Sequence, residues 1–180
     1  MAYLSTFRFG TPGMASVRHT LTAMIEQERD GYTPVSRDNV ERSRSRLNTA
    51  LEWRGVIADA LALTANVRHD DNASFEDFTT WRASASWKLP AFAPGLAARP
   101  HASVGTGVKY PTMFEQFGEF PGPIAFKPNP DLKPEESLGW DAGVEWSMLG
   151  GRLVVDLTYF AADIRNKIEG DDNFPEMPIN

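Results

Sequence analysis

Apolar and polar residues alternate at every second position along most of this chain, and the segment 137–148 shows the pattern most clearly. Its apolar row consists of Leu138, Trp140, Ala142, Val144, Trp146 and Met148. Its polar row consists of Ser137, Gly139, Asp141, Gly143, Glu145 and Ser147. Because successive side chains of a β-strand point to opposite faces, this period of two predicts a strand with one apolar and one polar face.

The same alternation recurs along the rest of the sequence. It is regular in residues 47–53, 61–67 and 80–89. It is less regular in residues 3–9, 15–28, 98–109 and 152–164. In the last of these segments, Val154 and Phe160 interrupt the alternation. No segment shows a convincing helical repeat, so the pattern predicts an all-β, antiparallel protein of about eight consecutive strands.

The lengths of the predicted strands favour a membrane barrel over a small sandwich. Several of them reach about ten to fourteen residues, roughly twice the usual globular strand. At about 3.3 Å per residue and a tilt near 45°, about eleven residues cover the apolar band of an outer-membrane barrel, which is about 25 Å tall.

The connections between the predicted strands alternate in length. Short turns are predicted at residues 10–13, 55–58 and 149–151. Longer polar loops are predicted at residues 30–43, 71–77 and 111–134. Short turns on one side and long loops on the other are typical of outer-membrane barrels. The connection 89–97 is longer than this rule prefers.

A soluble β-sandwich is the alternative that the pattern leaves open. A sandwich encloses its apolar rows between two sheets, whereas a membrane barrel turns them to lipid. The polar rows carry charges of both signs, which suits a wet or plugged lumen: Arg18, Glu26, Arg46, Glu52, Arg68, Arg82, Lys88, Asp141 and Glu145. All five tryptophans fall on apolar rows, where some are expected in aromatic girdles at the membrane interfaces: Trp53, Trp81, Trp87, Trp140 and Trp146.

Composition excludes several classes of protein. The 180 residues contain no run of eighteen apolar residues, which excludes a spanning helix. They contain no cysteine, which excludes disulfides, zinc–thiolate sites and cysteine nucleophiles. The net charge of -6 disfavours nucleic-acid binding. We predict no enzyme, no metal site and no cofactor, because no nucleophile–base pair is visible and the histidines are dispersed. No secretory signal is visible, so we expect an N-terminal part to be missing.

Three segments carry a resemblance to a known family. Residues 99–117 form a strand that leads into a Pro-Thr-x-x-Glu-x-Phe sequence, and residues 129–137 read Asn-Pro-x-Leu-x-Pro-Glu-x-Ser. Residues 157–168 contain Tyr-Phe and Asp-Ile pairs. In this order and spacing, the segments resemble the later barrel strands of TonB-dependent receptors, the family that imports iron–siderophore complexes and cobalamin.

The resemblance implies an antiparallel transmembrane β-barrel of about twenty-two strands around a plug. Residues 1–180 would be a partial barrel domain, with the plug domain and the terminal strands absent. The implied function is active transport of a ferric siderophore or cobalamin-like ligand across the bacterial outer membrane, energised by the TonB complex through the missing plug. Outer-membrane lipid and lipopolysaccharide are the other implied partners. A passive porin-type channel is an alternative function.

The loop 111–134 and its flanks hold the candidate site residues. Aromatic rings that could contact a bulky ligand, or form a small cluster that stabilises the loop, are Tyr110, Phe114, Phe117 and Phe120. Residues expected to shape the loop and its return into the next strand are Pro111, Glu115, Asn129, Pro130, Leu132, Pro134 and Glu135. Arg42, Arg44 and Arg46 share one face at strand spacing, and we expect a solvated rim that faces an anionic ligand or lipopolysaccharide.

Overall fold

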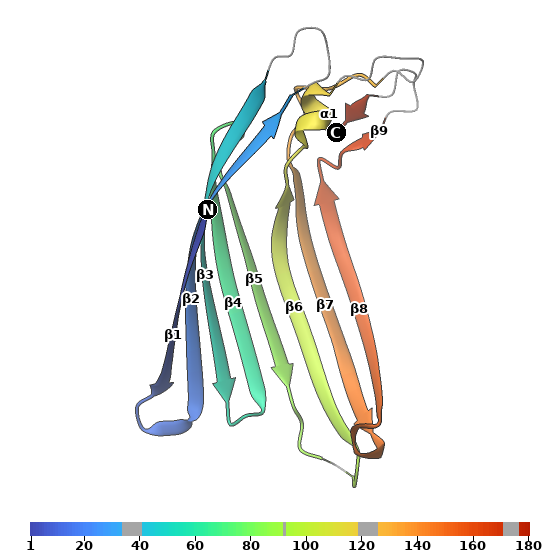
Figure 1. Cartoon of the computed structure of the whole chain (residues 1–180). Coiled ribbons are helices and arrows are strands. Elements are labelled where there is room, and N and C mark those ends of the chain that lie inside the picture. Colours follow the sequence, from blue (N-terminus) through green and yellow to red (C-terminus); the bar gives the residue numbers. More distant parts are fainter. Residues whose placement is uncertain (34–40, 92, 119–125, 171–176) are drawn as a thin grey trace.

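Eight strands form one antiparallel sheet in which each strand pairs with its neighbours in the sequence (Figure 1). The computed structural model describes all residues except 34–40, 92, 119–125 and 171–176. The strands are β1 (Ala2–Thr11), β2 (Met14–Tyr32), β3 (Arg42–Ile57), β4 (Leu61–Asn72), β5 (Phe78–Trp87), β6 (Ala97–Lys109), β7 (Glu135–Met148) and β8 (Leu153–Arg165). The remaining described elements are the helix α1 (Met113–Phe117), the 3-10 turn η1 (Leu149–Gly151) and the short strands β9 (Glu169–Gly170) and β10 (Pro178–Ile179).

All eight predicted strands are confirmed, although several are longer than the alternation indicated, β2, β3 and β4 most of all. β2 and β3 pair along sixteen positions, from Val17 opposite Ile57 to Tyr32 opposite Arg42. In Figure 1 the connections β1–β2, β3–β4, β5–β6 and β7–β8 lie at one end of the sheet, which we call the turn end. The other end, which carries α1, β9 and β10, is the loop end.

The backbone register brings the apolar rows of neighbouring strands onto one face of the sheet. Val104 pairs with Ala83 on one side and with Trp140 on the other, and Trp140 in turn pairs with Ala161. Within the described residues no second sheet covers this apolar face, and Leu138 and Trp140 are both 47% exposed. A sandwich that encloses these rows therefore does not fit the described part of the chain.

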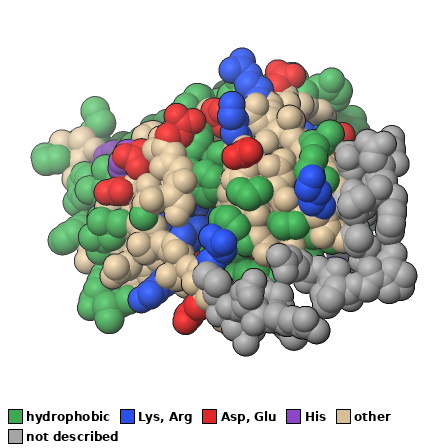
Figure 2. Space-filling view, turned by 90° about the horizontal axis from the view of Figure 1, so that it is seen from above, with side chains coloured by type: hydrophobic (Ala, Val, Ile, Leu, Met, Phe, Trp, Pro, Cys, Tyr) green, Lys and Arg blue, Asp and Glu red, His purple; other side chains and the backbone are tan. Residues whose placement is uncertain are grey.

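The opposite, polar face carries ion pairs between strands. The Arg99 guanidinium donates two hydrogen bonds to the Glu145 carboxylate, at 3.2 and 2.7 Å. Val154 and Phe160 of β8 also lie on this face, because they pair with Ser147 and Asp141 of β7. Both are exposed. Seen from the loop end, hydrophobic side chains gather towards the left border of the molecule, and charged side chains of both signs are scattered over the rest (Figure 2).

The tryptophans of the apolar face lie at two levels. In β5, Trp81 lies near the loop end and Trp87 at the turn end, and in β7 Trp140 and Trp146 are placed in the same way. The predicted position on apolar rows is therefore confirmed. The two tryptophans of each strand lie six positions apart, about half of the eleven residues that cover the apolar band of an outer-membrane barrel. Near the turn end, the Trp53 indole N–H donates to His19 Nδ1 at 3.2 Å.

Two connections differ from their predictions. Gly55 lies inside β3, where it pairs with His19 and Leu63, and the Trp53 ring covers it so closely that a Cβ there would come within 2.7 Å of the ring. The turn instead occupies residues 58–60, with Ala58 and Asp59 at positive φ.

The predicted loop 111–134 contains α1, whose capping box joins Thr112 and Glu115. A Thr-x-x-Glu sequence is the usual signature of such a helix start, so the sequence contained this signal. None of the helices among the described residues is long and apolar enough to cross a membrane.

Candidate functional site

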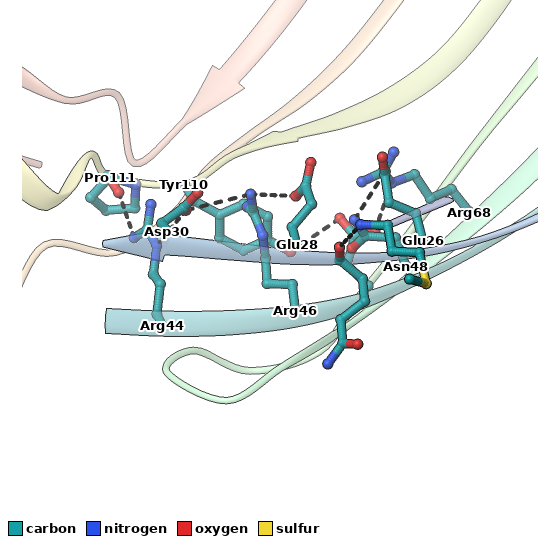
Figure 3. A network of polar contacts seen from close by, with 12 residues as sticks. Glu26, Glu28, Asp30, Arg44, Arg46, Asn48, Arg68, Tyr110 and Pro111 are labelled. Atoms are coloured by element: carbon teal, nitrogen blue, oxygen red, sulfur yellow. Dashed lines mark hydrogen bonds and ion pairs between the residues drawn. The ribbon is translucent and has the colours of Figure 1, made fainter. Parts of the chain in front are cut away.

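Arginines and carboxylates face each other at the loop ends of β2 and β3. The register places Arg44 opposite Asp30 and Arg46 opposite Glu28. Arg44 Nε donates to Asp30 Oδ2 at 3.0 Å, and Arg46 Nη2 donates to Glu28 Oε2 at 2.7 Å. Figure 3 shows these side chains between the two strands and the segment that carries Pro111. The alternating charges of two neighbouring strands thus neutralise one another.

The prediction of a solvated arginine rim is wrong for two of the three arginines. The side chains of Arg44 and Arg46 are only 8% and 16% exposed, whereas Arg42 is exposed. The pattern of β3 alone did not reveal the carboxylates of β2 or the loops that cover this end of the sheet. Because carboxylates already neutralise Arg44 and Arg46, Arg42 is the arginine of the three best placed to meet an anion.

Each of the three arginines also lies over an aromatic ring supplied by a loop. The guanidinium carbon lies 4.4 Å from the ring centroid of Phe117 for Arg42, and 4.7 Å from that of Tyr110 for Arg46. Arg44 lies 5.7 Å from the Phe75 centroid. A cation over an aromatic face is attracted to the ring, so the arginines hold the β4–β5 and β6–β7 connections against β3.

Tyr110 and Pro111 are enclosed at the centre of this arrangement. Arg44 Nη1 donates to the carbonyl of Pro111 at 2.7 Å, and Pro111 is fully buried. The Tyr110 hydroxyl donates to Asp70 Oδ2 at 3.3 Å. Burial raises the pKa of Tyr110, and the Asp70 carboxylate raises it further, so the phenol stays protonated and keeps this donor. Asn48 of β3 lies opposite Asp70 of β4 in the register. Together these groups form what we call the loop-end cluster: Glu28, Asp30, Arg44, Arg46, Asn48, Asp70, Tyr110 and Pro111.

The other predicted aromatic residues lie beside the cluster or outside the described residues. Phe114 of α1 stacks on Phe126 with ring centroids 4.7 Å apart, and its ring meets the edge of Tyr32 at 6.5 Å. Phe117 lies under Arg42. Phe120 falls in the segment outside the described residues. The structure therefore brings Tyr110, Phe114 and Phe117 to the loop end, each with a partner.

The predicted motif residues lie where the loop returns to the sheet. The backbone N–H of Asn129 donates to the Glu115 carbonyl at 2.9 Å, and Gln116 Nε2 donates to the carbonyl of Pro130 at 3.3 Å. Leu132 and Pro134 are buried.

Glu135 opens β7 and joins three segments of the loop end. Its Oε1 accepts from Lys109 Nζ at 3.0 Å and from the backbone N–H of Ile168 at 2.8 Å. The Ile168 N–H, followed by the Lys109 ammonium, lowers the pKa of Glu135. The carboxylate thus links the end of β6, the start of β7 and the chain after β8.

Sequence reasoning missed several residues of this region. Phe75 and Phe78 pack on Tyr110 with ring centroids 5.6 and 5.9 Å away, and nothing in their local sequence indicates that contact. Glu28 and Asp30 did have a signal. Glu28 is the last residue of the predicted strand 15–28, and Asp30 continues its period-two pattern beyond that end, opposite a strand that starts with alternating arginines.

A pocket of about 420 Å³ lies between the start of β3 and α1. Its lining residues include Arg42, Phe117, Ser74 and Gln116, together with Glu41 and with Arg44, which Asp30 already neutralises. Such a lining can offer an anion a positive charge and can offer a flat group an aromatic surface. Among the described residues, no group of three or more His, Asp or Glu side chains is arranged to hold a metal ion.

Comparisons with known proteins match both the sequence and the fold. A family model described as "TonB dependent receptor-like, beta-barrel" matches residues 5–178. The crystal structure of the siderophore receptor PirA from Pseudomonas aeruginosa matches 99% of this chain, with a TM-score of 0.75 and 21% identity. PirA from Acinetobacter baumannii matches 94%, with a TM-score of 0.68 and 17% identity. The chain spans 34% and 28% of the length of these two receptors. Because the sequence identities are low, these two matches show a similar fold and nothing more.

Proposed function

Because the chain belongs to the family of TonB-dependent receptor-like β-barrels, we propose that it forms part of the wall of a bacterial outer-membrane receptor that imports a scarce nutrient. The ligand class we propose is a ferric siderophore, with a cobalamin-like molecule as the second choice. In this proposal a plug, which the matched segment does not include, couples the barrel to the TonB complex. The apolar face meets membrane lipid, and the loop end meets lipopolysaccharide and the ligand.

The observation that carries the proposal is the uncovered apolar face of eight consecutive long strands. A continuous apolar surface in water would drive aggregation, whereas hydrocarbon solvates it without penalty. The face ends towards the loop end in polar residues of three different strands, Gln27, Asp71 and Glu136. Such a boundary is expected where strands leave the lipid core. The family consists of transport receptors rather than enzymes, which agrees with this arrangement.

Uptake by cells that carry or lack the complete receptor gene tests the function. We expect the gene to confer uptake of at least one member of a panel of radioiron-loaded hydroxamate and catecholate siderophores and radiolabelled cyanocobalamin. We also expect this uptake to stop when TonB is deleted or the proton-motive force is collapsed. Uptake that persists without TonB and rises linearly with ligand concentration would instead identify a passive channel.

For the ligand contact, we propose Arg42 and Phe117 in the pocket between β3 and α1, with Tyr110 and Phe114 as supporting rings. The experiment compares the receptor with Phe117→Ala and with Tyr110→Ala/Phe114→Ala. Loss of one aromatic stacking contact is expected to weaken binding about tenfold. Unchanged affinity in both variants would mean that the rings only stabilise the loop. Phe120 belongs to the same predicted set, and Phe120→Ala completes the series.

A further inference from the structure

Two segments far apart in the sequence lie together at the loop end: residues 126–134 of the β6–β7 connection, and the described residues 166–170 and 177–180 after β8 (Figure 1). The side chain of Asn180 spans them. Its Oδ1 accepts from the Lys133 N–H at 2.9 Å, and its Nδ2 donates to the carbonyls of Lys133 and Asn166, both at 2.8 Å. One amide therefore contacts the backbones of both segments.

Asn129 makes the second connection between the two segments, and both polar atoms of its side-chain amide form hydrogen bonds. Its Oδ1 accepts from the Asp131 N–H at 3.0 Å, which closes a local turn. Its Nδ2 donates to the Pro178 carbonyl at 2.9 Å, in the other segment. Its own N–H donates to the Glu115 carbonyl of α1, and its carbonyl accepts from the Leu132 N–H. The Nδ2 bond is the one that leaves the loop.

The surroundings of this bond limit its replacement by water. Pro178 is buried, and Leu132 in the Asn129 turn is 3% exposed. A third contact, from the Ile168 N–H to the Glu135 carboxylate, ties the same two segments next to the sheet. A partly buried carbonyl that loses its donor bears a desolvation penalty, so loss of the Asn129 Nδ2 donor is expected to loosen both partners.

We propose that Asn129 is a positioning residue that clamps residues 126–134 of the β6–β7 connection to residues 177–180, so that these two segments move as one body. The clamp places α1, and with it Phe117, against a fixed neighbour. A ligand that moves α1 then also moves residues 177–180. The link to a ligand rests on the proposed function, whereas the clamp itself rests on the contacts of Asn129 and Asn180.

Two substitutions separate the clamp from the local turn. Asn129→Asp keeps an oxygen for the Asp131 N–H but loses the donor to Pro178, whereas Asn129→Ala loses both. Asn66→Asp is the control, because it makes the same change in the middle of β4. The measurement is amide hydrogen exchange of the purified complete receptor, in peptides that contain Ile168, Ile179 and Phe117, together with its melting temperature.

We expect Asn129→Asp to speed exchange of the Ile168 and Ile179 peptides about tenfold, as for loss of one partly buried hydrogen bond, with an unchanged melting temperature. Asn129→Ala should add faster exchange around Phe117, and Asn66→Asp should change none of these peptides. Wild-type exchange at Ile168 and Ile179 in Asn129→Asp would overturn the proposal, because Asn129 would then shape only its own turn. Neither measurement uses a ligand, so a failed uptake experiment leaves this result intact.

Discussion

The sheet and the loop-end cluster are stabilised in opposite ways. Along the apolar face, large side chains such as Phe7, Leu157 and Tyr159 are 63%, 70% and 66% exposed. In the loop-end cluster, polar side chains are enclosed instead, and Asn48 and Asp70 are 0% and 4% exposed. A water-soluble domain shows the reverse distribution, with apolar groups inside and charged groups outside.

The apolar face and the loop-end cluster therefore need different surroundings to be stable. The apolar face gains its stabilisation only from an external apolar medium, because the described residues place nothing over it. In the loop-end cluster, hydrogen bonds and ion pairs inside the chain replace water around Arg44 and Tyr110, although Arg46 Nε and Asn48 Oδ1 are buried without a hydrogen-bond partner among the described residues. Changes to the face should therefore depend on the membrane, and changes to the cluster should not.

The largest effect is expected for a charge placed on the apolar face. Ala83 lies between Trp81 and Trp87 and pairs with Ala65 and Val104 on this face, and its neighbour Ser84 pairs with Thr64 and Ser103 on the polar face. Ala83→Arg should destabilise the receptor by about 2–4 kcal/mol in lipid vesicles, as for arginine in a bilayer core. Ser84→Arg, the matched control, should change little. The measurement is reversible urea unfolding in vesicles, and equal losses in both variants would contradict the assignment of the faces.

The next effect contrasts two arginines of β3. Arg44→Ala leaves the buried Pro111 carbonyl without its donor and leaves Asp30 with only Arg46 Nη2, at 3.7 Å, so it should lower the free energy of unfolding by about 2 kcal/mol. Arg54 pairs with Glu52 at 3.8 Å, and both side chains are substantially exposed. Arg54→Ala should therefore change stability by less than about 0.5 kcal/mol. The same urea titration measures both, and similar losses would show that enclosure does not strengthen the Arg44 contacts.

The sequence predicted the sheet better than it predicted the cluster, for a physical reason. Alternation is a local property, so all eight strands and the apolar face followed from it, including the exceptions Val154 and Phe160. Burial of Arg44 depends on Asp30 and Phe75, which reach it through strand pairing and a loop. The local sequence around Arg44 does not indicate contacts with residues that are distant in the sequence. The arginines were therefore expected to be solvated. The roles of the individual loop residues stay predictions.

A smaller, pH-dependent effect is expected at Glu135. The folded pKa of Glu135 lies below its ordinary value of 4.5, so its carboxylate stabilises the contact with Ile168 above that pH. This contribution is lost as the pH falls through the lowered folded pKa. The protection of the Ile168 amide against hydrogen exchange, corrected for the intrinsic exchange rate, should fall as this contribution is lost. Glu135→Gln should lower the protection of the Ile168 amide by about 1 kcal/mol at neutral pH. In this variant the protection should no longer decrease as the pH falls. An acid response that persists in Glu135→Gln would assign it to another group.

The smallest effect is expected at the turn end, where Arg18 hydrogen-bonds to Asp59. The bond lowers the pKa of Asp59, yet the two side chains are 60% and 75% exposed, so water and salt screen the pair. Asp59→Asn removes the charge while keeping a residue that tolerates the positive φ of this turn. We expect no measurable shift of the urea midpoint, in contrast to Arg44→Ala. A clear loss would mean that ion pairs contribute equally at both ends of the sheet, and enclosure at the loop end would then explain nothing about its stability.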